Sequence, residues 1–560
     1  MHSKKILVLM CLVTIAFFGA LIRLVGLDKN PNGLYVDEAS TGYNAWSLAT
    51  TGKDEYGKEF PLAMRFLGSY TPPLYTYTTS QVISLLGLSV FSVRLTSAIA
   101  GILLIPLIFV LAKSLNFTNN NLTLLFAPAF MAISPWAIYY SRIGYETNFA
   151  FFIYSLGVLF LWWGIKNNIS LVTGIGLLSL STNAYHAERL LVPLSLFIYF
   201  LIFRKELISK KRIKILFLAG IVSLLVVFPQ LLILTSPANT VRGLGLFYHQ
   251  ALINQVEKMD ILPQVITYPL SFFREFFSQY LAYYSPRNLF FEPDPDTQRS
   301  LPELSTFYPW MIFLYFVGLI ELFKSIKEKS TKFILLIFFT SAVPASLTGD
   351  PFSTQRALPL LLPSILVMTT GVDKLLQNSF KKYILVCLVI LSTFSLFYLY
   401  RSYAVLLPNE RAKFWGFGYQ KLAEEISKRP NEKFLIDSGR IKPAYIELAF
   451  YLKYPPLEFQ QVVDSKIKDS YYQNVNWNGD LTFGQVQTRA IKWEEDIYKD
   501  QILVGDEFAV SGSQANEHFL VKVFEIKSPA DEILFVGFRT NPAEKCRSGW
   551  NYLCRDKLYE

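Results

Sequence analysis

Long apolar runs alternate with short polar turns over the first 400 residues of the chain. Each run is about as long as a helix needs to cross a bilayer. The runs lie near residues 6–26, 91–112, 121–140, 149–165, 168–183, 188–203, 215–234, 307–323, 333–348, 357–376 and 383–400. The segment Pro72–Leu88 is also apolar, but it is short and rich in Thr and Ser, so we interpret it as an interfacial or re-entrant helix. The pattern predicts a mainly helical, polytopic transmembrane bundle of eleven spans.

Basic residues predict the orientation of these spans. With the N-terminus inside, the cytoplasmic loops contain Lys113, Lys166 and the segments 204–214, 324–332 and 374–382. All of these loops then lie on one side, as the positive-inside rule requires. Counting Pro72–Leu88 as a crossing would move them all outside. We therefore predict a multi-pass protein of the cell membrane whose C-terminus is extracytoplasmic.

Three long segments fall on the outer side in this topology. They are two loops, near residues 27–90 and 235–306, and a tail from 401 to 560 that no longer has the pattern of a membrane protein. In the tail, Arg411–Lys428 has a helical pattern, and we expect strands at Lys433–Asp437, Gln501–Gly505, Phe519–Ile526 and Ile533–Phe538. The chain is thus expected to divide into a membrane module, 1–400, and a soluble α/β domain, 401–560.

Composition agrees with a membrane protein and excludes a nucleic-acid-binding one. Of the 560 residues 52% are hydrophobic and only 17% are charged, with a mean hydropathy of +0.32. The net charge of +10 comes largely from loops that set membrane orientation. The first run follows Lys4 and Lys5 like a signal peptide, but no small-residue cleavage site follows it, so we expect a retained helix.

Four cysteines divide into two kinds. Cys11 and Cys387 lie in apolar runs, where a thiol usually packs as a small apolar group. Cys546 and Cys554 lie eight residues apart in the outer tail, where a disulfide can persist. Without further Cys or His nearby they would make a poor zinc site, so we expect them to be bonded to each other.

Two adjacent carboxylates, Asp37 and Glu38, follow the first run. An ionisable pair at a membrane boundary is costly unless it is solvated, paired or used. One interpretation is a helix N-terminus, where acidic side chains favour the positive end of the helix dipole. The other interpretation is a functional site, and the remaining outer turns bear on the choice.

Charged residues also gather in two short outer turns, 141–148 and 182–189. The first turn contains Arg142 and Glu146, the second contains His186 and Arg189, and Arg94 lies at the outer end of the second span. Each arginine by itself could simply extend to lipid headgroups. Together with Asp37 and Glu38, however, they lie at one depth on one side of the membrane, which predicts a shared polar cavity.

The residue types in this cavity indicate a reaction on a lipid-linked anion. Carboxylates can act as a general base or as metal ligands. Arginines bind phosphate well through paired N–H groups, and apolar walls can admit a lipid tail. This combination is suited to sugar transfer from a polyprenyl-phosphate-linked donor.

Three motifs carry a resemblance to a known family. They are Tyr35-Val36-Asp37-Glu38, then Tyr70-Thr71-Pro72-Pro73-Leu74-Tyr75, then Phe91-Ser92-Val93-Arg94-Leu95-Thr96-Ser97-Ala98-Ile99-Ala100-Gly101. In this order they resemble the polytopic glycosyltransferases of the C-type (GT-C) fold, nearest to protein O-mannosyltransferases and the aminoarabinose transferase of lipid A. The likeness covers roughly residues 1–235. Beyond that only the architecture is similar.

The resemblance implies an inverting transfer with Asp37 as the general base. Glu38 would be its neighbour or the base itself, and Glu146 stands where many members have Asp. Thr71 stands where many members have a Lys that meets the lipid phosphate. The donor phosphate would therefore be bound by arginines, and the candidates are Arg94, Arg142, Arg189, Arg242 and Arg287. We expect further cavity residues at Tyr35, Tyr75, Tyr185 and His186, although His186 also suits a hydrogen-bonded turn.

Several alternatives stay open from the sequence. A transporter or flippase of lipid-linked glycans would also need an outer polar cavity, but it often has internal repeats that this chain lacks. A polymerase or ligase that uses a lipid-diphosphate donor is a second alternative, and a membrane scaffold without activity is a third. The sequence identifies neither the sugar nor the acceptor, which could be a protein, a lipid or a glycan. It also leaves open whether a divalent metal ion binds.

Overall fold

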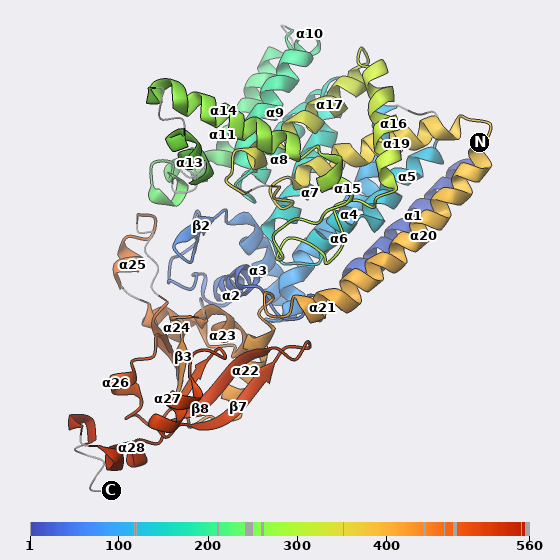
Figure 1. Cartoon of the computed structure of the whole chain (residues 1–560). Helices are drawn as coiled ribbons and strands as arrows, with labels where there is room; N and C mark the ends of the chain where they lie inside the picture. Colours follow the sequence, from blue (N-terminus) through green and yellow to red (C-terminus); the bar gives the residue numbers. More distant parts are fainter. Residues whose placement is uncertain are drawn as a thin grey trace.

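The computed structural model describes residues 2–554 except 117, 119, 210–211, 241–249, 259–262, 351, 441–443, 464, 474–478 and 550. A helical bundle forms one end of the molecule and a β-sheet the other, with the first outer loop between them (Figure 1). The first outer loop comes near the start of the chain, yet it lies between the bundle and the sheet, which is formed by the last part of the chain.

Helices occupy all eleven apolar runs. They are α1 (His2–Leu24), α4 (Val90–Leu115), α5 (Phe126–Ile133) with α6 (Pro135–Ser141), α7 (Glu146–Gly164), α8 (Asn168–Ser181), α9 (Glu188–Ile202), α11 (Ile213–Leu232), α16 (Met311–Lys324), α17 (Lys329–Ser341), α19 (Leu361–Leu376) and α20 (Lys381–Tyr400). Among the described residues, six helices are long and apolar enough to cross a membrane alone, or seven if α5 and α6, bent by 52°, form one span. The mainly helical, multi-pass architecture is confirmed, whereas the number of eleven spans stays a prediction.

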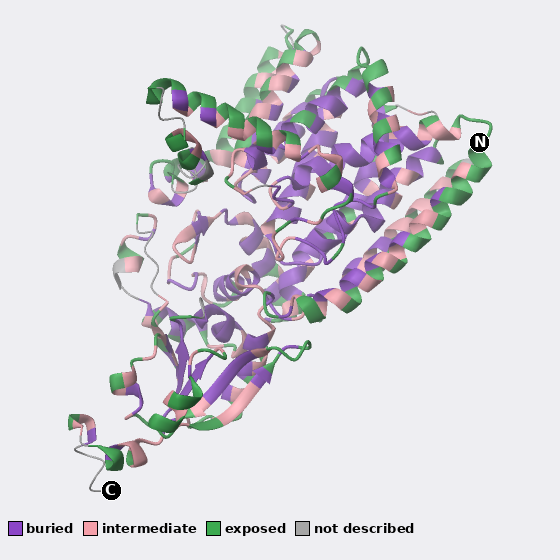
Figure 2. Ribbon diagram, viewed as in Figure 1, coloured by how far each residue is buried: buried purple, intermediate pink, exposed green. Residues whose placement is uncertain are grey.

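Burial separates the helices into a peripheral set, which the rest of the protein covers little, and an inner set (Figure 2). The most apolar windows of α1, α11 and α20 are only 6%, 11% and 17% buried, whereas those of α4, α7 and α19 are 67%, 67% and 78% buried. An apolar helix that its own protein does not cover is suited to contact with lipid. The inner helices therefore form the core of the bundle, and two of them, α4 and α7, carry predicted site residues at their N-terminal ends.

The two outer loops are more structured than the sequence suggested. The first contains α2 (Val36–Thr51), the hairpin of β1 (Met64–Phe66) and β2 (Ser69–Thr71), and α3 (Leu74–Leu86). With 13 residues α3 is too short to span a bilayer, in agreement with a helix that does not cross. The second contains α13 (Gln250–Lys258), α14 (Gln264–Ala282) and α15 (Pro286–Phe290). Short helices α10 (Arg204–Leu207) and α18 (Val343–Ser346) complete the membrane half.

The C-terminal region builds a mixed six-stranded sheet in the order β4-β5-β3-β6-β8-β7. Its strands are β3 (Phe434–Asp437), β4 (Leu481–Phe483), β5 (Val486–Arg489), β6 (Ile502–Gly505), β7 (Val521–Lys527) and β8 (Ile533–Arg539). The central strand β3 is buried throughout and runs parallel to β5 and β6, whereas the other pairs are antiparallel. The four predicted strands are present, whereas β4 and β5 were not predicted.

Helices surround this sheet and connect it to the bundle. They are α22 (Phe417–Ser427), α23 (Tyr445–Tyr451), α24 (Pro456–Val462), α25 (Ser465–Asp469), α26 (Trp493–Asp496), α27 (Gly512–Glu517) and α28 (Pro542–Ser548). The last apolar helix, α20, continues through η3 (Arg401–Leu406) into α21 (Leu407–Glu410). The helix predicted at 411–428 is present as α22, but it begins later than expected, at Phe417.

Two hydrophobic cores hold the chain together. One fills the helical bundle, and the other joins the first outer loop to the C-terminal region, with Leu34, Ala39 and Tyr43 packed among Leu422, Phe434, Tyr445 and Ile502. Gly42 permits the close approach of α2 and α23, since a Cβ at Gly42 would lie 2.8 Å from the ring of Phe450. The division of the chain at residue 400 stays a prediction, but the first outer loop packs with the tail.

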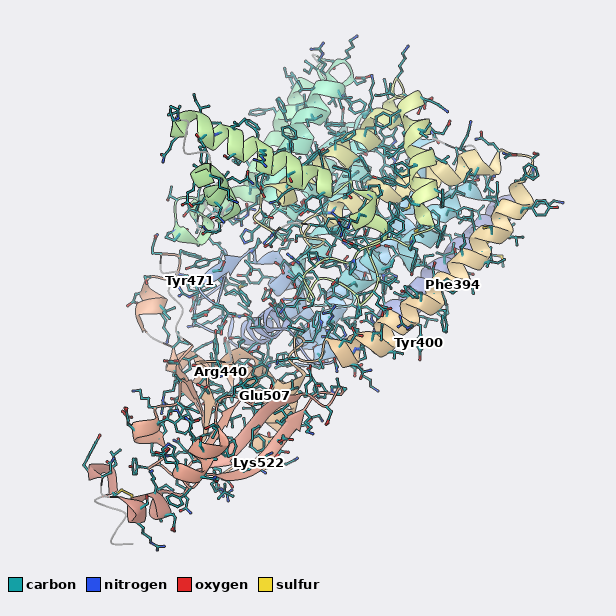
Figure 3. All side chains as sticks on the ribbon, viewed as in Figure 1. Phe394, Tyr400, Arg440, Tyr471, Glu507 and Lys522 are labelled. Carbon is teal, nitrogen blue, oxygen red and sulfur yellow. A yellow bond between two sulfur atoms is a disulfide. The ribbon has the colours of Figure 1, made fainter. Side chains whose placement is uncertain are left out.

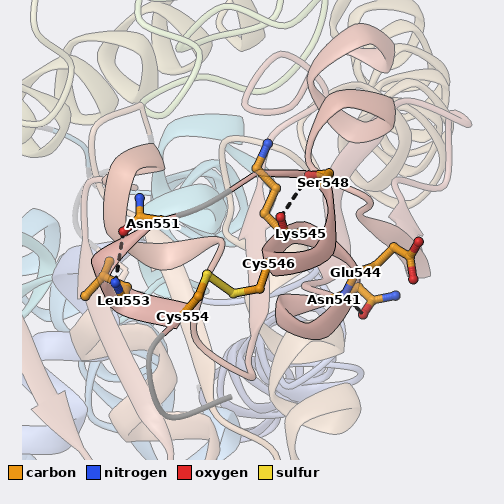
Figure 4. The surroundings of a disulfide bond; sticks show 8 residues. All are labelled: Asn541, Glu544, Lys545, Cys546, Ser548, Asn551, Leu553 and Cys554. Carbon is orange, nitrogen blue, oxygen red and sulfur yellow. Dashed lines mark hydrogen bonds between the residues drawn. A yellow bond between two sulfur atoms is a disulfide. The ribbon is translucent and has the colours of Figure 1, made fainter. Parts of the chain in front are cut away.

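The predicted disulfide between Cys546 and Cys554 is confirmed (Figure 4). It closes the short segment after α28, at the end of the chain farthest from the bundle (Figure 1). Cys11 and Cys387 are free thiols.

Candidate active site

Asp37 and Glu38 begin helix α2, but the two carboxylates have different surroundings. Glu38 is fully buried, and its Oε2 accepts the backbone N–H of Tyr35 at 3.3 Å, which is one half of a capping box. Its Oε1 accepts the N–H of Gly144 at 2.6 Å. The interpretation as a helix cap is therefore correct for Glu38, and only Asp37 lines the cavity described below.

Arg94 is the ion-pair partner of Glu38. Its Nε and Nη2 donate to the two oxygens of the Glu38 carboxylate at 2.8 and 2.9 Å, and both side chains are 0% exposed. Three further bonds reach the carbonyls of Leu27, Pro31 and Gly33. All five N–H groups of the guanidinium are thus used. The prediction that Arg94 binds the donor phosphate is wrong, because Arg94 is a buried structural residue that ties the first outer segment to α4.

Arg142 has a similar structural role. Its Nε donates to the hydroxyl of Tyr403 at 2.7 Å, and its other nitrogens donate to the carbonyls of Ile22, Gly26 and Asn30. The side chain is 3% exposed and is not part of the cavity lining. The prediction of a phosphate contact is wrong here too, because backbone carbonyls around the end of α1 use the guanidinium.

A cavity of about 750 Å³ lies where the outer ends of the helices meet the first loop. Its wall combines segments that are far apart in sequence: the start of α2, the β1–β2 hairpin, the first residue of α7, the turn before α9, and the loop between α18 and α19. Five predicted site residues line it, namely Asp37, Glu146, Tyr185, His186 and Arg189. The shared polar cavity expected from the sequence is therefore present.

Hydrogen bonds fix several of these side chains. The Nε2 of His186 lies 2.8 Å from the carbonyl oxygen of Tyr70, so His186 is a hydrogen-bonded turn residue. Arg189 donates from Nη1 to Asn239 Oδ1 at 2.5 Å and from Nε to the carbonyl of Thr182 at 3.4 Å. Both residues thereby have defined positions at the cavity wall.

Three other predicted residues lie outside the cavity lining. Arg287 is largely exposed and pairs with Glu292 at 2.6 Å, outside the cavity. Tyr75 is buried, with its hydroxyl 3.3 Å from the carbonyl of Val93, and Tyr35 packs against the rings of Tyr145 and Trp415. These three expectations of cavity residues are wrong, because helix and loop packing orient the side chains elsewhere. Arg242 falls outside the described residues.

Part of the cavity lining was not predicted from the sequence. Asp350, Gln355 and Arg356 come from the polar loop between α18 and α19, and Arg65 comes from β1. The loop could have been found, because 348–356 is a charged outer turn like 141–148 and 182–189. Arg356 donates to Asp350 Oδ2 at 2.5 Å and to the Thr348 hydroxyl at 3.0 Å. Burial raises the pKa of Asp350, but Arg356 and Arg299 outweigh that effect and hold the pKa below its usual value.

Among the residues that the structure describes, no three His, Cys, Asp or Glu side chains are grouped closely enough to hold a metal ion. The three cavity carboxylates, Asp37, Glu146 and Asp350, come from three separate elements.

No family model matches this chain, and no curated protein sequence matches it. The fold, in contrast, matches solved structures. ArnT from Cupriavidus metallidurans bound to undecaprenyl phosphate superposes with a TM-score of 0.54 at 13% identity, over 94% of this chain and 97% of ArnT. The chain has the GT-C fold.

A second GT-C structure matches with a lower TM-score. The archaeal oligosaccharyltransferase AglB from Archaeoglobus fulgidus, in complex with an inhibitory peptide and a dolichol-phosphate, matches with a TM-score of 0.49 at 12% identity, over 96% of this chain and 74% of AglB. The match to ArnT extends over nearly the whole of both chains, so the GT-C fold includes the C-terminal region and not only the first 235 residues that carry the sequence motifs.

Proposed function

We propose that this chain is a membrane glycosyltransferase that moves a sugar from a polyprenyl-phosphate-linked donor to an acceptor hydroxyl at the outer face of the membrane. The observation that carries the proposal is the cavity, because the carboxylate Asp37 and the cations Arg189 and Arg356 all line it. The GT-C fold supports it, since the similar ArnT structure holds undecaprenyl phosphate. A volume of about 750 Å³ is adequate for a sugar and its phosphate.

Asp37 would act as the general base of a single displacement. Its carboxylate takes the proton of the acceptor hydroxyl while the acceptor oxygen attacks the anomeric carbon of the donor sugar. The bond between that carbon and the phosphate oxygen breaks, and the electron pair leaves with the polyprenyl phosphate. Attack from the side opposite to the leaving group inverts the anomeric configuration.

Arg189 and Arg356 would stabilise the departing phosphate. The phosphate gains negative charge as the glycosidic bond breaks, so cations fixed beside it bind the transition state more strongly than the ground state. The hydrogen bonds from Arg189 to Asn239 and from Arg356 to Asp350 hold both side chains before the donor binds. Glu146, which also lines the cavity, would accept hydrogen bonds from sugar or acceptor hydroxyls.

The decisive experiment measures transfer of radiolabelled sugar from polyprenyl phosphate by the purified protein in detergent. A detergent solution contains no membrane that separates two compartments, so sugar transfer measured there excludes a protein that only transports the donor. Asp37→Asn should reduce turnover by about 10²–10⁴, the usual worth of a positioned base. Donor affinity should stay unchanged, because Asn keeps the shape of the side chain.

A matched control is Asp28→Asn, which makes the same chemical change at an exposed residue of the same outer segment. It should leave turnover unchanged. Full activity of Asp37→Asn would contradict the assignment of the base, and absence of any transfer by the unaltered protein with all polyprenyl-phosphate sugars would contradict the proposed reaction.

A further inference from the structure

The β1–β2 hairpin forms one wall of the cavity. Met64, Arg65 and Phe66 from β1 and Thr71 from the end of β2 line it. Arg65 is only 1% exposed, yet it borders the cavity. Its Nη1 lies 3.4 Å from the hydroxyl oxygen of Tyr70, to which it donates, and its guanidinium lies 5.3 Å from the centre of the Tyr56 ring. Arg65 is therefore a buried cation with a fixed position at the edge of the site.

This hairpin is held by a segment about 400 residues later in the chain. The hydroxyl oxygen of Tyr471 accepts the backbone N–H of Arg65 at 2.9 Å, and the same hydroxyl donates to Asp54 Oδ2 at 2.5 Å. In return the Tyr70 hydroxyl donates to the carbonyl of Tyr471. Figure 3 labels Tyr471 where the C-terminal region meets the first outer loop. One tyrosine of the C-terminal region thus contacts both strands of the hairpin and the loop before it.

A second bond reinforces the contact. The hydroxyl oxygen of Tyr472 accepts the N–H of Leu62 at 2.8 Å, two residues before β1. A two-stranded hairpin of three-residue strands is not stable alone in water, so its position depends on what it packs against. The position of Arg65 is therefore set by the segment that contains Tyr471 and Tyr472.

Two acidic residues, Asp54 and Glu55, interact electrostatically with Arg65. Burial raises the pKa of Glu55 to about 8, so this carboxyl is mostly neutral near pH 7. The Asp54 carboxylate is occupied by the Tyr471 hydroxyl and by the backbone N–H groups of Tyr56 and Lys58. Because the Arg65 guanidinium is buried at the cavity wall, the low dielectric constant around it strengthens its attraction for an anion in the cavity.

We propose that Arg65 binds the phosphate of the lipid-linked donor and that Tyr471 is its positioning residue, so that the C-terminal region is a working part of the site. This inference rests on the proposed function. Arg65 would add a third cation to Arg189 and Arg356, from the β1–β2 hairpin. Thr71, beside it on the hairpin, offers a hydroxyl but no charge.

The test uses the full-length protein in detergent and measures binding of undecaprenyl phosphate, with undecaprenol as the uncharged comparison. Arg65→Gln should weaken undecaprenyl phosphate binding about tenfold or more, as expected for a lost charge-assisted contact. Binding of undecaprenol should not change. Arg65→Lys should restore part of the affinity, since an ammonium keeps the charge but lacks the guanidinium fork.

Tyr471→Phe should act through Arg65. It removes the hydroxyl that accepts the Arg65 N–H and should weaken undecaprenyl phosphate binding by about three- to tenfold. The matched control is Tyr43→Phe, which removes a hydroxyl bonded to the carbonyl of Tyr454 at 2.8 Å across the same contact between the first loop and the C-terminal region. It should lower the melting temperature by a similar amount but leave phosphate binding unchanged.

A double variant separates positioning from general loss of structure. If Tyr471 acts through Arg65, Tyr471→Phe should have no further effect on binding in the Arg65→Gln background. Unchanged phosphate binding in Arg65→Gln would overturn the assignment of Arg65, and additive effects of the two substitutions would overturn the positioning role of Tyr471. Because the readout is binding, the result does not depend on sugar transfer, and a failure of the proposed function would be seen separately.

Discussion

The buried pair of Arg94 and Glu38 makes the sharpest prediction about stability. Arg94→Ala removes a guanidinium that donates to both Glu38 oxygens and to three backbone carbonyls, all without exposure to solvent. Removing one member of a buried ion pair costs about 3–5 kcal/mol, because the other charge is left unpaired. Total stability is typically about 5–15 kcal/mol, so this single loss is a large part of it.

The effect should appear as a large fall in the melting temperature of the purified protein in detergent, followed by tryptophan fluorescence. Glu38→Gln should also destabilise, because it leaves Arg94 charged and buried. Arg287→Ala is the matched control, since the exposed pair of Arg287 and Glu292 should add little. At low temperature the folded fraction of Arg94→Ala should still bind undecaprenyl phosphate.

The opposite pattern would refute this reasoning. If Arg94→Ala kept the melting temperature of the unaltered protein and lost donor binding, Arg94 would be an accessible phosphate ligand and the buried pair would be wrong. Asp37→Asn gives the complementary result, with stability kept and turnover lost. The two adjacent acids, Asp37 and Glu38, are thus separated by one stability assay and one activity assay.

Three further predictions concern pH and topology. Burial raises the pKa of Glu55 from 4.5 to about 8, so the folded state holds this proton more tightly than the unfolded state does. Stability should therefore fall as pH rises from 4.5 to about 8, and Glu55→Gln should flatten this fall in melting temperature over the same range. Burial opposes ionisation of Asp496, but Arg489 and Lys499 outweigh this effect and lower the pKa of Asp496 to about 2. The ionised Asp496 therefore stabilises the folded state above pH 4, and this contribution is lost as pH falls through about 2. Asp496→Asn should therefore lower the melting temperature at pH 7 but hardly at pH 2, and equal losses at both would contradict the ion pair. A reporter fused after Glu410 should be extracytoplasmic and one inserted after Ile208 cytoplasmic; the same side for both would contradict the orientation.

Much of the fold was accessible from the sequence because its signals are local. Apolar runs of sufficient length predicted helices that the structure contains, and alternating or buried apolar segments predicted four of six strands. The spacing of Cys546 and Cys554 in a tail expected outside the cytoplasm predicted their disulfide. Charged turns between apolar runs also predicted that Asp37, Glu146 and Arg189 share one cavity. In each case the information lies within a few neighbouring residues or in the side of the membrane on which a segment is predicted to lie.

What the sequence could not determine is the direction of each side chain. Asp37 and Glu38 are adjacent in sequence, but successive residues on a helix point about 100° apart. One therefore faces the cavity and the other faces Arg94. Arg94 and Arg142 had the same charge and the same expected depth as Arg189, and only the positions of backbone carbonyls in the folded protein show that the first two are used internally.

The tertiary structure also decided which distant segments meet. Arg65 and Arg356 are nearly 300 residues apart in sequence, and no periodicity links either of them to the start of α2. Tyr471 reaches the first outer loop because the two share one hydrophobic core. Hydrophobicity and charge act on each segment separately, and for that reason the sequence predicted a helical membrane bundle, a polar cavity and a folded tail. The partners of each charge were decided only by packing, since a buried charge is stable only where distant segments supply its hydrogen bonds.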